Sequence, residues 1–100
     1  MVKIGFAGEH PGRVLWEEYL KPKGISQSRF ARDVDISFRR ANELLNGKRG
    51  FTPDTALRVA RYLGMSAEFW MNWQALHDLQ QTARKRQRSY DRIRPADEAA

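Results

Sequence analysis

Cysteine is absent from the 100-residue chain, which excludes a disulfide framework and a cysteine-based zinc site. The two histidines, His10 and His77, lie far apart in the sequence without the spacing of metal ligands, so we expect no metal and no other cofactor. No apolar run approaches the roughly 18 residues that span a bilayer, and no signal-peptide pattern opens the chain. We therefore expect a cytoplasmic protein without a membrane partner.

Catalytic motifs are lacking as well. Neither histidine has a candidate nucleophile near it in the sequence, and no phosphate-binding loop or catalytic triad is recognisable. The sequence therefore predicts a binding protein and not an enzyme.

Acidic residues are outnumbered, because 18 Lys and Arg stand against 12 Asp and Glu for a net charge of +6. Basic proteins favour polyanionic partners, since phosphates release condensed counterions when a basic surface binds them. Residues 1–83 contain 12 Lys and Arg against 9 Asp and Glu, whereas residues 84–100 contain 6 against 3. Half of the excess charge therefore lies in a short C-terminal tail.

Glycine, proline and capping residues divide the sequence into segments with helical periodicity, and no strand-like alternation persists. A proline at the first helical position and a glycine after the last one are typical of helix ends. The punctuation predicts an all-α fold of five helices: from Pro11 to just before Pro22, from the Ser26 cap to Asp35, from the Ser37 cap to Asn46, from the Thr52 cap to Gly64, and from the Ser66 cap onward.

The second and third predicted helices are joined by only two residues, Asp35 and Ile36. So short a junction forces a steep crossing angle, which is typical of a helix-turn-helix, here at residues 26–49. The exposed side of its second helix, with the following loop, carries four basic residues and one acid, which fits phosphate contact and base reading in the major groove of double-stranded DNA. The candidate DNA-binding residues are Gln27, Ser37, Phe38, Arg39, Arg40, Asn42, Glu43, Asn46, Lys48 and Arg49.

Arg39 and Arg40 both lie one turn from the start of this helix, where a guanidinium can reach guanine O6 and N7. The sequence leaves open which of the two makes that contact. Ser37 is first of all a helix cap, and Lys48 and Arg49 lie beside Gly47 in a loop that can approach the DNA backbone.

The fifth predicted helix is rich in large apolar residues, and Phe69, Trp70, Trp73 and Leu76 are predicted as a dimer interface. Aromatic residues are enriched at interfaces, but the same row would also fit the core of one chain. We assign residues 1–82 to the helix-turn-helix domain and residues 83–100 to a basic tail, partly helical or disordered. This tail could contact nucleic acid, a protein partner, or neither.

The central segment resembles the helix-turn-helix of the lambda-repressor-like (XRE) regulators, in which Ser-Gln opens the first helix and Asn-Gly follows the second. These pairs are Ser26-Gln27 and Asn46-Gly47 here. More narrowly, the chain is similar to the HigA-type antitoxins, also called the VapI family. The motifs that carry this similarity are HPG at 10–12, LNGKRG at 45–50, TPDTALRVARYLG at 52–64 and S-x-EFW-x-N-x-Q at 66–74.

The resemblance implies a homodimer that binds a palindromic operator in its own promoter and neutralises a co-encoded HigB-type toxin, a RelE-like mRNA-cleaving ribonuclease. A stand-alone XRE-type repressor without a toxin is the alternative. The chain departs from the family pattern at two positions. Asp35 replaces the usual glycine of the turn, which Asp tolerates in a left-handed conformation, and Phe38 occupies the first exposed position of the recognition helix.

Overall fold

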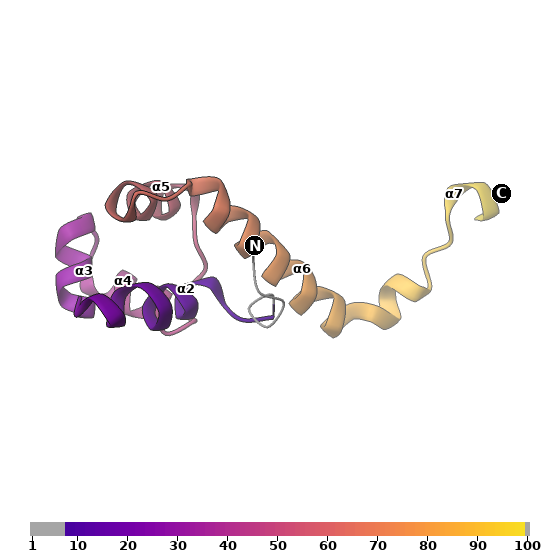
Figure 1. The fold of residues 1–100 in the computed structure, drawn as a ribbon. Coiled ribbons are helices and arrows are strands. Elements are labelled where there is room, and N and C mark those ends of the chain that lie inside the picture. Colours follow the sequence, from indigo (N-terminus) through magenta and orange to yellow (C-terminus); the bar gives the residue numbers. More distant parts are fainter. Residues whose placement is uncertain (1–7, 100) are drawn as a thin grey trace.

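The computed structural model describes residues 8–99, so the start of the predicted domain, residues 1–7, lies outside the described residues. The chain is elongated, with principal extents of 57 × 28 × 19 Å, and Figure 1 shows α6 running away from the other main helices. Residues 8–99 contain no strand, and the all-α prediction with its five helices is confirmed. The elements are α2 (Pro11–Val14), the π-helical turn η1 (Leu15–Leu20), the 3-10 turn η2 (Lys21–Lys23), α3 (Gln27–Val34), α4 (Phe38–Leu45), α5 (Pro53–Leu63), α6 (Ala67–Asp91) and α7 (Ala96–Ala99).

The first predicted helix is a composite of α2, η1 and η2. His10 caps it, since its Nδ1 accepts a hydrogen bond from the backbone N–H of Gly12 at 2.9 Å. The helix does not end before Pro22, as predicted, but continues as a 3-10 turn that includes this proline. Pro22 lies at the start of that turn, where its missing N–H breaks no hydrogen bond. Gly24, with a φ of 70°, then ends the segment in the left-handed conformation.

Gly12 brings the first helix against α4. A Cβ atom at this position would lie 2.0 Å from the carbonyl oxygen of Leu44, closer than any side chain allows. Glycine is therefore required where these two backbones meet, and the contact fixes the first helix beside the helix-turn-helix.

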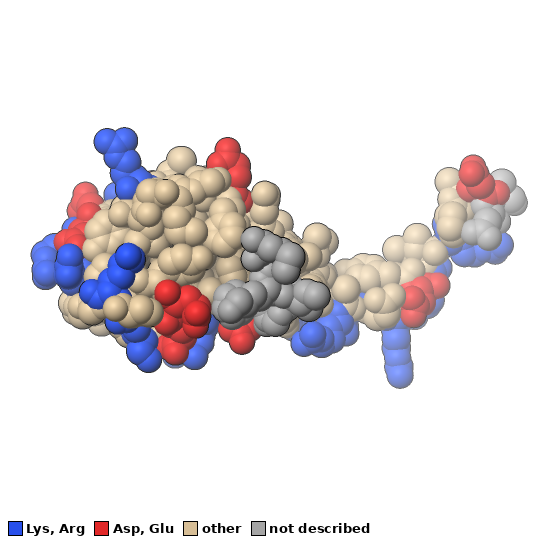
Figure 2. Space-filling model, in the orientation of Figure 1, with Lys and Arg blue, Asp and Glu red and all other residues tan. Residues whose placement is uncertain are grey.

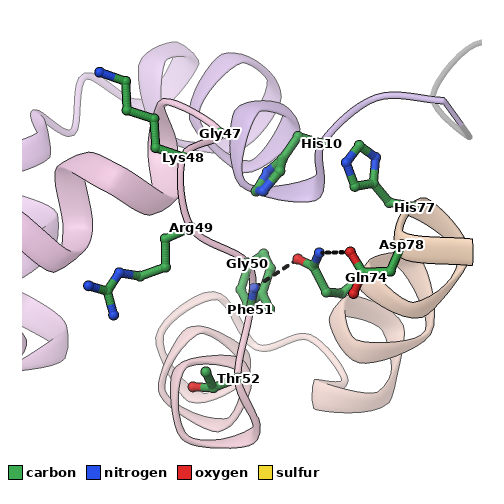
Figure 3. Close-up of a pocket in the computed structure, with 10 residues that line it drawn as sticks. All are labelled: His10, Gly47, Lys48, Arg49, Gly50, Phe51, Thr52, Gln74, His77 and Asp78. Carbon is green, nitrogen blue, oxygen red and sulfur yellow. Dashed lines mark hydrogen bonds between the residues drawn. The ribbon is translucent and has the colours of Figure 1, made fainter. Parts of the chain in front are cut away.

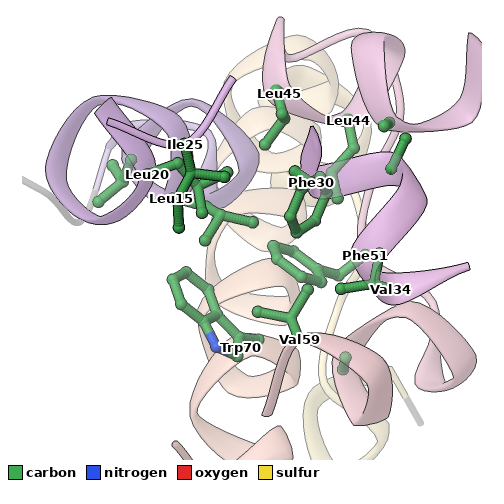
Figure 4. Packing of buried hydrophobic residues seen from close by; sticks show 14 of the residues in the cluster. Leu15, Leu20, Ile25, Phe30, Val34, Leu44, Leu45, Phe51, Val59 and Trp70 are labelled. Atoms are coloured by element: carbon green, nitrogen blue, oxygen red, sulfur yellow. The ribbon is translucent and has the colours of Figure 1, made fainter. Parts of the chain in front are cut away.

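The hydrophobic core lies where α5 and α6 pack against the first helix and the helix-turn-helix (Figure 4). Trp70 is its largest member and is fully buried. Its ring stacks on Phe51 with centroids 5.1 Å apart and meets Tyr19 edge-on at 5.5 Å. Full burial of a large apolar side chain stabilises a fold by about 1.5–3 kcal/mol, so Trp70 helps to hold α6 to the body.

The structure corrects part of the predicted dimer interface. Trp70 is 0% exposed and Trp73 is also buried, within a single chain. A fully covered side chain has no surface left for a second chain, so both tryptophans belong to the core. Leu76, by contrast, is 43% exposed, and Phe69 is half-buried. These two residues stay available for the predicted interface.

Helix α6 continues through the expected boundary after residue 82 and into the arginine-rich stretch. Arg86 departs from helical geometry (φ −122°, ψ 17°), which kinks the helix near its C-terminal end. Beyond this kink the chain extends away from the body, and every residue from 84 to 97 is exposed (Figure 1). Among the described residues, no helix combines the length and the apolar character that a membrane span requires.

Candidate nucleic-acid interface

Serine caps define both helices of the central motif. The Ser26 hydroxyl accepts a hydrogen bond from the backbone N–H of Arg29 at 3.0 Å, and the Ser37 hydroxyl accepts one from Arg40 at 3.1 Å. Both caps were predicted and are confirmed. Because Ser37 engages its side chain in this way, its first role is to start α4 at a fixed residue.

The turn between α3 and α4 is fixed by hydrogen bonds to α3 and to α5. Asp35 adopts the left-handed conformation (φ 59°, ψ 54°), as predicted for the residue in place of the usual glycine. The backbone N–H of Ile36 then donates to the carbonyl of Ala31 at 3.0 Å. From α5, the guanidinium of Arg58 donates to the carbonyl oxygens of Val34 at 2.9 Å and Asp35 at 3.3 Å. Arg58 could not be recognised as a turn residue from the sequence, because the two carbonyl groups lie more than twenty residues away along the chain.

Gln27 and Asn42 connect the two helices of the motif. The Nδ2 atom of Asn42 on α4 donates to Oε1 of Gln27 on α3 at 2.8 Å, and both side chains are half-buried. This bond orients the Gln27 amide and leaves its N–H donors available for a phosphate oxygen. The two predicted residues thus lie together in the structure.

Arg40 is anchored to α5. Its Nη2 donates to Oδ2 of Asp54 and to Oγ1 of Thr55, both at 2.8 Å, and its side chain is 30% exposed. The hydrogen bond from Arg40 to Asp54, followed by the one from Arg58, lowers the pKa of the Asp54 carboxyl. Arg40 therefore joins α4 to the start of α5, a role that the sequence analysis did not assign.

Arg39 has the opposite surroundings, since its side chain is 86% exposed. Its Nε donates to the Glu43 carboxylate at 3.3 Å, one turn further along α4. Glu43 also accepts two hydrogen bonds from the guanidinium of Arg49, at 2.8 and 3.0 Å. These bonds, with Arg49 as the main contributor before Arg39, lower the pKa of the Glu43 carboxyl. One carboxylate thus aligns an arginine of the recognition helix with an arginine of the following loop.

The remaining predicted residues border this pair. Phe38 is the first residue of α4 and is 53% exposed, in a position to meet an apolar group. Asn46 follows the last residue of α4 and is half-buried, and Gly47 then turns the chain with a φ of 77°. Lys48 is exposed in the loop, and in Figure 3 its side chain points away from Gln74 and His77. The ten predicted residues therefore come from α3, α4 and the adjoining loop.

Gln74 of α6 holds this loop in place (Figure 3). Its buried Oε1 accepts a hydrogen bond from the backbone N–H of Phe51 at 2.8 Å, and its Nε2 donates to Asp78 at 2.9 Å. A Cβ atom on Gly50 would lie 2.9 Å from the Gln74 side chain, so the loop rests directly on α6. Gln74 was not among the predicted site residues, although it ends the S-x-EFW-x-N-x-Q pattern that supported the resemblance.

The two histidines, distant in sequence, line a cleft beside this loop (Figure 3). Their rings meet edge-on with centroids 5.2 Å apart. Burial, followed by the nearby His77, lowers the pKa of His10 from its ordinary value of 6.5, while Asp78 and a backbone hydrogen bond at Arg49 partly oppose this shift. Within the described residues, His, Cys, Asp and Glu side chains form no group that could hold a metal ion.

Two capped helices joined by a short turn in which Asp35 is left-handed, with a positively charged recognition helix exposed on one side, define a helix-turn-helix domain. The family model described as "Helix-turn-helix" matches residues 17–70, and the chain belongs to this family.

Relatives and solved structures narrow the family further. The chain is 45% identical over 78 residues to virulence-associated protein I of Dichelobacter nodosus, with 78% of this chain and 72% of the relative covered. It is 31% identical to antitoxin HigA-1 of Vibrio cholerae over 84% of this chain and 79% of that one. The structure of Pseudomonas aeruginosa antitoxin HigA with the higBA promoter superimposes with a TM-score of 0.85 at 32% identity, covering 89% of this chain and 98% of that chain. The resemblance to HigA antitoxins is therefore confirmed.

Proposed function

We propose that this chain is a sequence-specific DNA-binding antitoxin that represses its own promoter and neutralises a RelE-like mRNA-cleaving toxin. The exposed arginine at the start of α4 carries the DNA-binding part of this proposal. Arg39 is held by Glu43 and otherwise faces solvent, where a bidentate contact with guanine is geometrically available. The similar Pseudomonas HigA, whose structure is described with the higBA promoter, supports the proposal that this chain binds DNA.

Each proposed contact follows from the local structure. Arg39 reads a base edge, and Phe38 is placed to meet a thymine methyl group. Phosphates near the two helix ends are contacted by Gln27, Ser37 and Asn46. Asn42 supports this contact by orienting Gln27. Lys48 and Arg49 approach the backbone from the loop, and Glu43 aligns the arginines. We assign Arg40 an anchoring role, because its guanidinium is already bonded to Asp54 and Thr55.

Binding to an operator tests this assignment directly. Duplex DNA from the region upstream of the chain's own reading frame should show a protected palindrome in a footprinting assay, at a protein concentration where unrelated DNA is unprotected. Protection of two half-sites about 10 base pairs apart is expected for a symmetric dimer. Uniform protection of both DNAs at every concentration would contradict sequence-specific binding.

A homodimer is part of the proposal, with Phe69 and Leu76 of α6 as interface residues. Leu76 is exposed on the same helix that packs into the core through Trp70 and Trp73. It therefore presents an apolar side chain to solvent on a helix that the core holds in place. Leu76→Glu should shift the protein toward monomer in sedimentation experiments. Leu57→Glu, at an exposed leucine on α5, is the matched control and should leave the association state unchanged.

The toxin partner distinguishes the antitoxin from a stand-alone repressor. Co-expression of this chain with the product of the adjacent reading frame should give a co-purifying complex and should abolish that product's toxicity. Operator binding without any co-purifying partner would favour the stand-alone repressor. Both versions act on DNA, and we propose the cytoplasm as their location.

A further inference from the structure

The C-terminal part of α6 and the residues after it form a second basic surface, which we call the basic arm (residues 84–94). It contains six Lys and Arg but one acid, Asp91. The carboxylate of Asp91 accepts a hydrogen bond from the neutral amide of Gln87 at 2.8 Å. The arm therefore carries a net charge of +5, against +3 for residues 1–83, over a much shorter length of chain.

Packing does not account for this charge. All residues of the arm are exposed, and Figure 2 shows Lys and Arg side chains along the extended end of the molecule, away from the body. Within the described residues, the side chains of Arg84, Lys85 and Arg88 make no ion pair, whereas Arg39, Arg40 and Arg58 are each paired with a carboxylate. Six charges held close together on one exposed segment repel one another, and a polyanion relieves that repulsion.

Three kinds of polyanion could bind the arm, and its amino-acid composition distinguishes between them. Insertion into an anionic membrane needs a broad apolar face, but the arm has only Tyr90 and Ile93 as large apolar residues. Binding of single-stranded RNA relies on stacking against several aromatic rings, and the arm has one. Contact with duplex phosphates needs only exposed cations, which the arm supplies.

We propose that the basic arm binds phosphates of duplex DNA without sequence preference, outside the half-site that α4 reads. This inference rests on the proposed function, because the helix-turn-helix delivers the duplex to the arm. Once α4 is docked, arm binding becomes intramolecular and is favoured by a high effective concentration. At about 1.5 Å per helical residue, the 25 residues of α6 place the arm tens of ångströms from the helix start, which is on the scale of one DNA turn.

Salt dependence measures the arm separately from base reading. The full chain and the triple variant Arg84→Gln, Lys85→Gln, Arg88→Gln are titrated onto a random-sequence 40-base-pair duplex and onto the operator, between 50 and 200 mM salt. Loss of three phosphate contacts should lower the slope of log affinity against log salt by about 2.7 on both duplexes. The affinity difference between the two proteins should therefore shrink by about 40-fold across this range.

A matched variant controls for total charge. Lys21→Gln, Lys23→Gln, Arg61→Gln also removes three exposed positive charges, but from the body of the protein. It should change the slope by much less than the arm variant. Glutamine and the residues it replaces have similar helix propensities, and unchanged helicity by circular dichroism verifies that each variant folds.

Each outcome bears on one proposal. Equal slopes for the wild type and the arm variant on both duplexes would overturn the arm proposal. Tighter arm-dependent binding to a 40-nucleotide single-stranded RNA, or to vesicles containing phosphatidylserine, would overturn the choice of duplex DNA. A slope change on random DNA without any operator preference would support the arm while contradicting sequence-specific binding by the helix-turn-helix.

Discussion

The helix-turn-helix and the basic arm both carry positive charge, but they hold it in different ways. In the helix-turn-helix, Glu43 aligns Arg39 and Arg49, while Asp54 and Thr55 fix Arg40. In the arm, Arg84, Lys85 and Arg88 extend into solvent. Fixed side chains have little conformational entropy left to lose on binding and suit the reading of bases, whereas unconstrained cations suit contact with phosphates at many positions.

The two regions also differ in what supports them. The helix-turn-helix rests on a core that includes Trp70, and the arm has no core of its own. Trp70→Ala should lower the free energy of unfolding by about 3–5 kcal/mol, because it leaves a large cavity. Tyr90→Ala, at an exposed aromatic residue of the arm, should change it by no more than about 0.5 kcal/mol. Urea unfolding followed by circular dichroism measures both, and equal effects would show that the arm is part of the cooperative core.

The close backbone contact between the first helix and α4 should make the next largest contribution to the stability of the helix-turn-helix domain. Gly12→Ala forces a Cβ atom against the carbonyl oxygen of Leu44 and should destabilise the fold by about 1–3 kcal/mol. Gly8→Ala is the matched control, since nothing lies within 4 Å of a Cβ atom there. Thermal unfolding of the two variants compares them, and a stable Gly12→Ala protein would contradict the required close approach.

Replacing Arg40 should destabilise the protein more than replacing its neighbour Arg39. Arg40→Ala removes hydrogen bonds to Asp54 and Thr55 and should lower the free energy of unfolding by about 0.5–1.5 kcal/mol. Arg39→Ala removes only an exposed pair with Glu43 and should cost less than about 0.5 kcal/mol. If the order of these effects is reversed in chemical denaturation, Arg40 is not the anchor.

His10 should make stability depend on pH. Because its pKa is lower in the folded than in the unfolded protein, the unfolded state binds more protons as the pH falls below about 6.5. Stability is therefore complete above that pH and decreases toward pH 5, before the exposed carboxylates begin to titrate. His10→Asn keeps a capping oxygen but does not titrate, so its unfolding free energy should be flatter over this range, and an equally steep profile would exclude His10 as the cause.

Local signals in the sequence were sufficient for most of the fold. Serine and threonine caps, Pro11, Pro53 and Gly64 located the helix ends, and Asp35 adopts the left-handed turn that its position predicted. These features act within a few residues, so they can be recognised without a structure. The π-helical turn and the extension past Pro22 were not predicted, since they depend on how the first helix packs.

Long-range pairing accounts for what the sequence could not reveal about the site. Arg40 and Arg39 are adjacent and chemically identical, and only the arrival of α5 beside Arg40 separates their roles. The same holds for Trp70 and Trp73, whose helical spacing fits a dimer interface as well as a core. Only the packing of distant aromatic rings such as Tyr19 and Phe51 against Trp70 decides between the two. Gln74 and Arg58 act on segments more than twenty residues away.

The central claim is that Arg39 reads a base while Arg40 supports the fold, and the specificity ratio tests it most directly. This ratio is the affinity for the operator divided by that for random DNA, measured by competition at one salt concentration. Arg39→Ala should reduce the specific binding free energy by about 1–3 kcal/mol and leave random-DNA binding nearly unchanged. An Arg39→Ala protein that keeps the wild-type ratio would contradict the account.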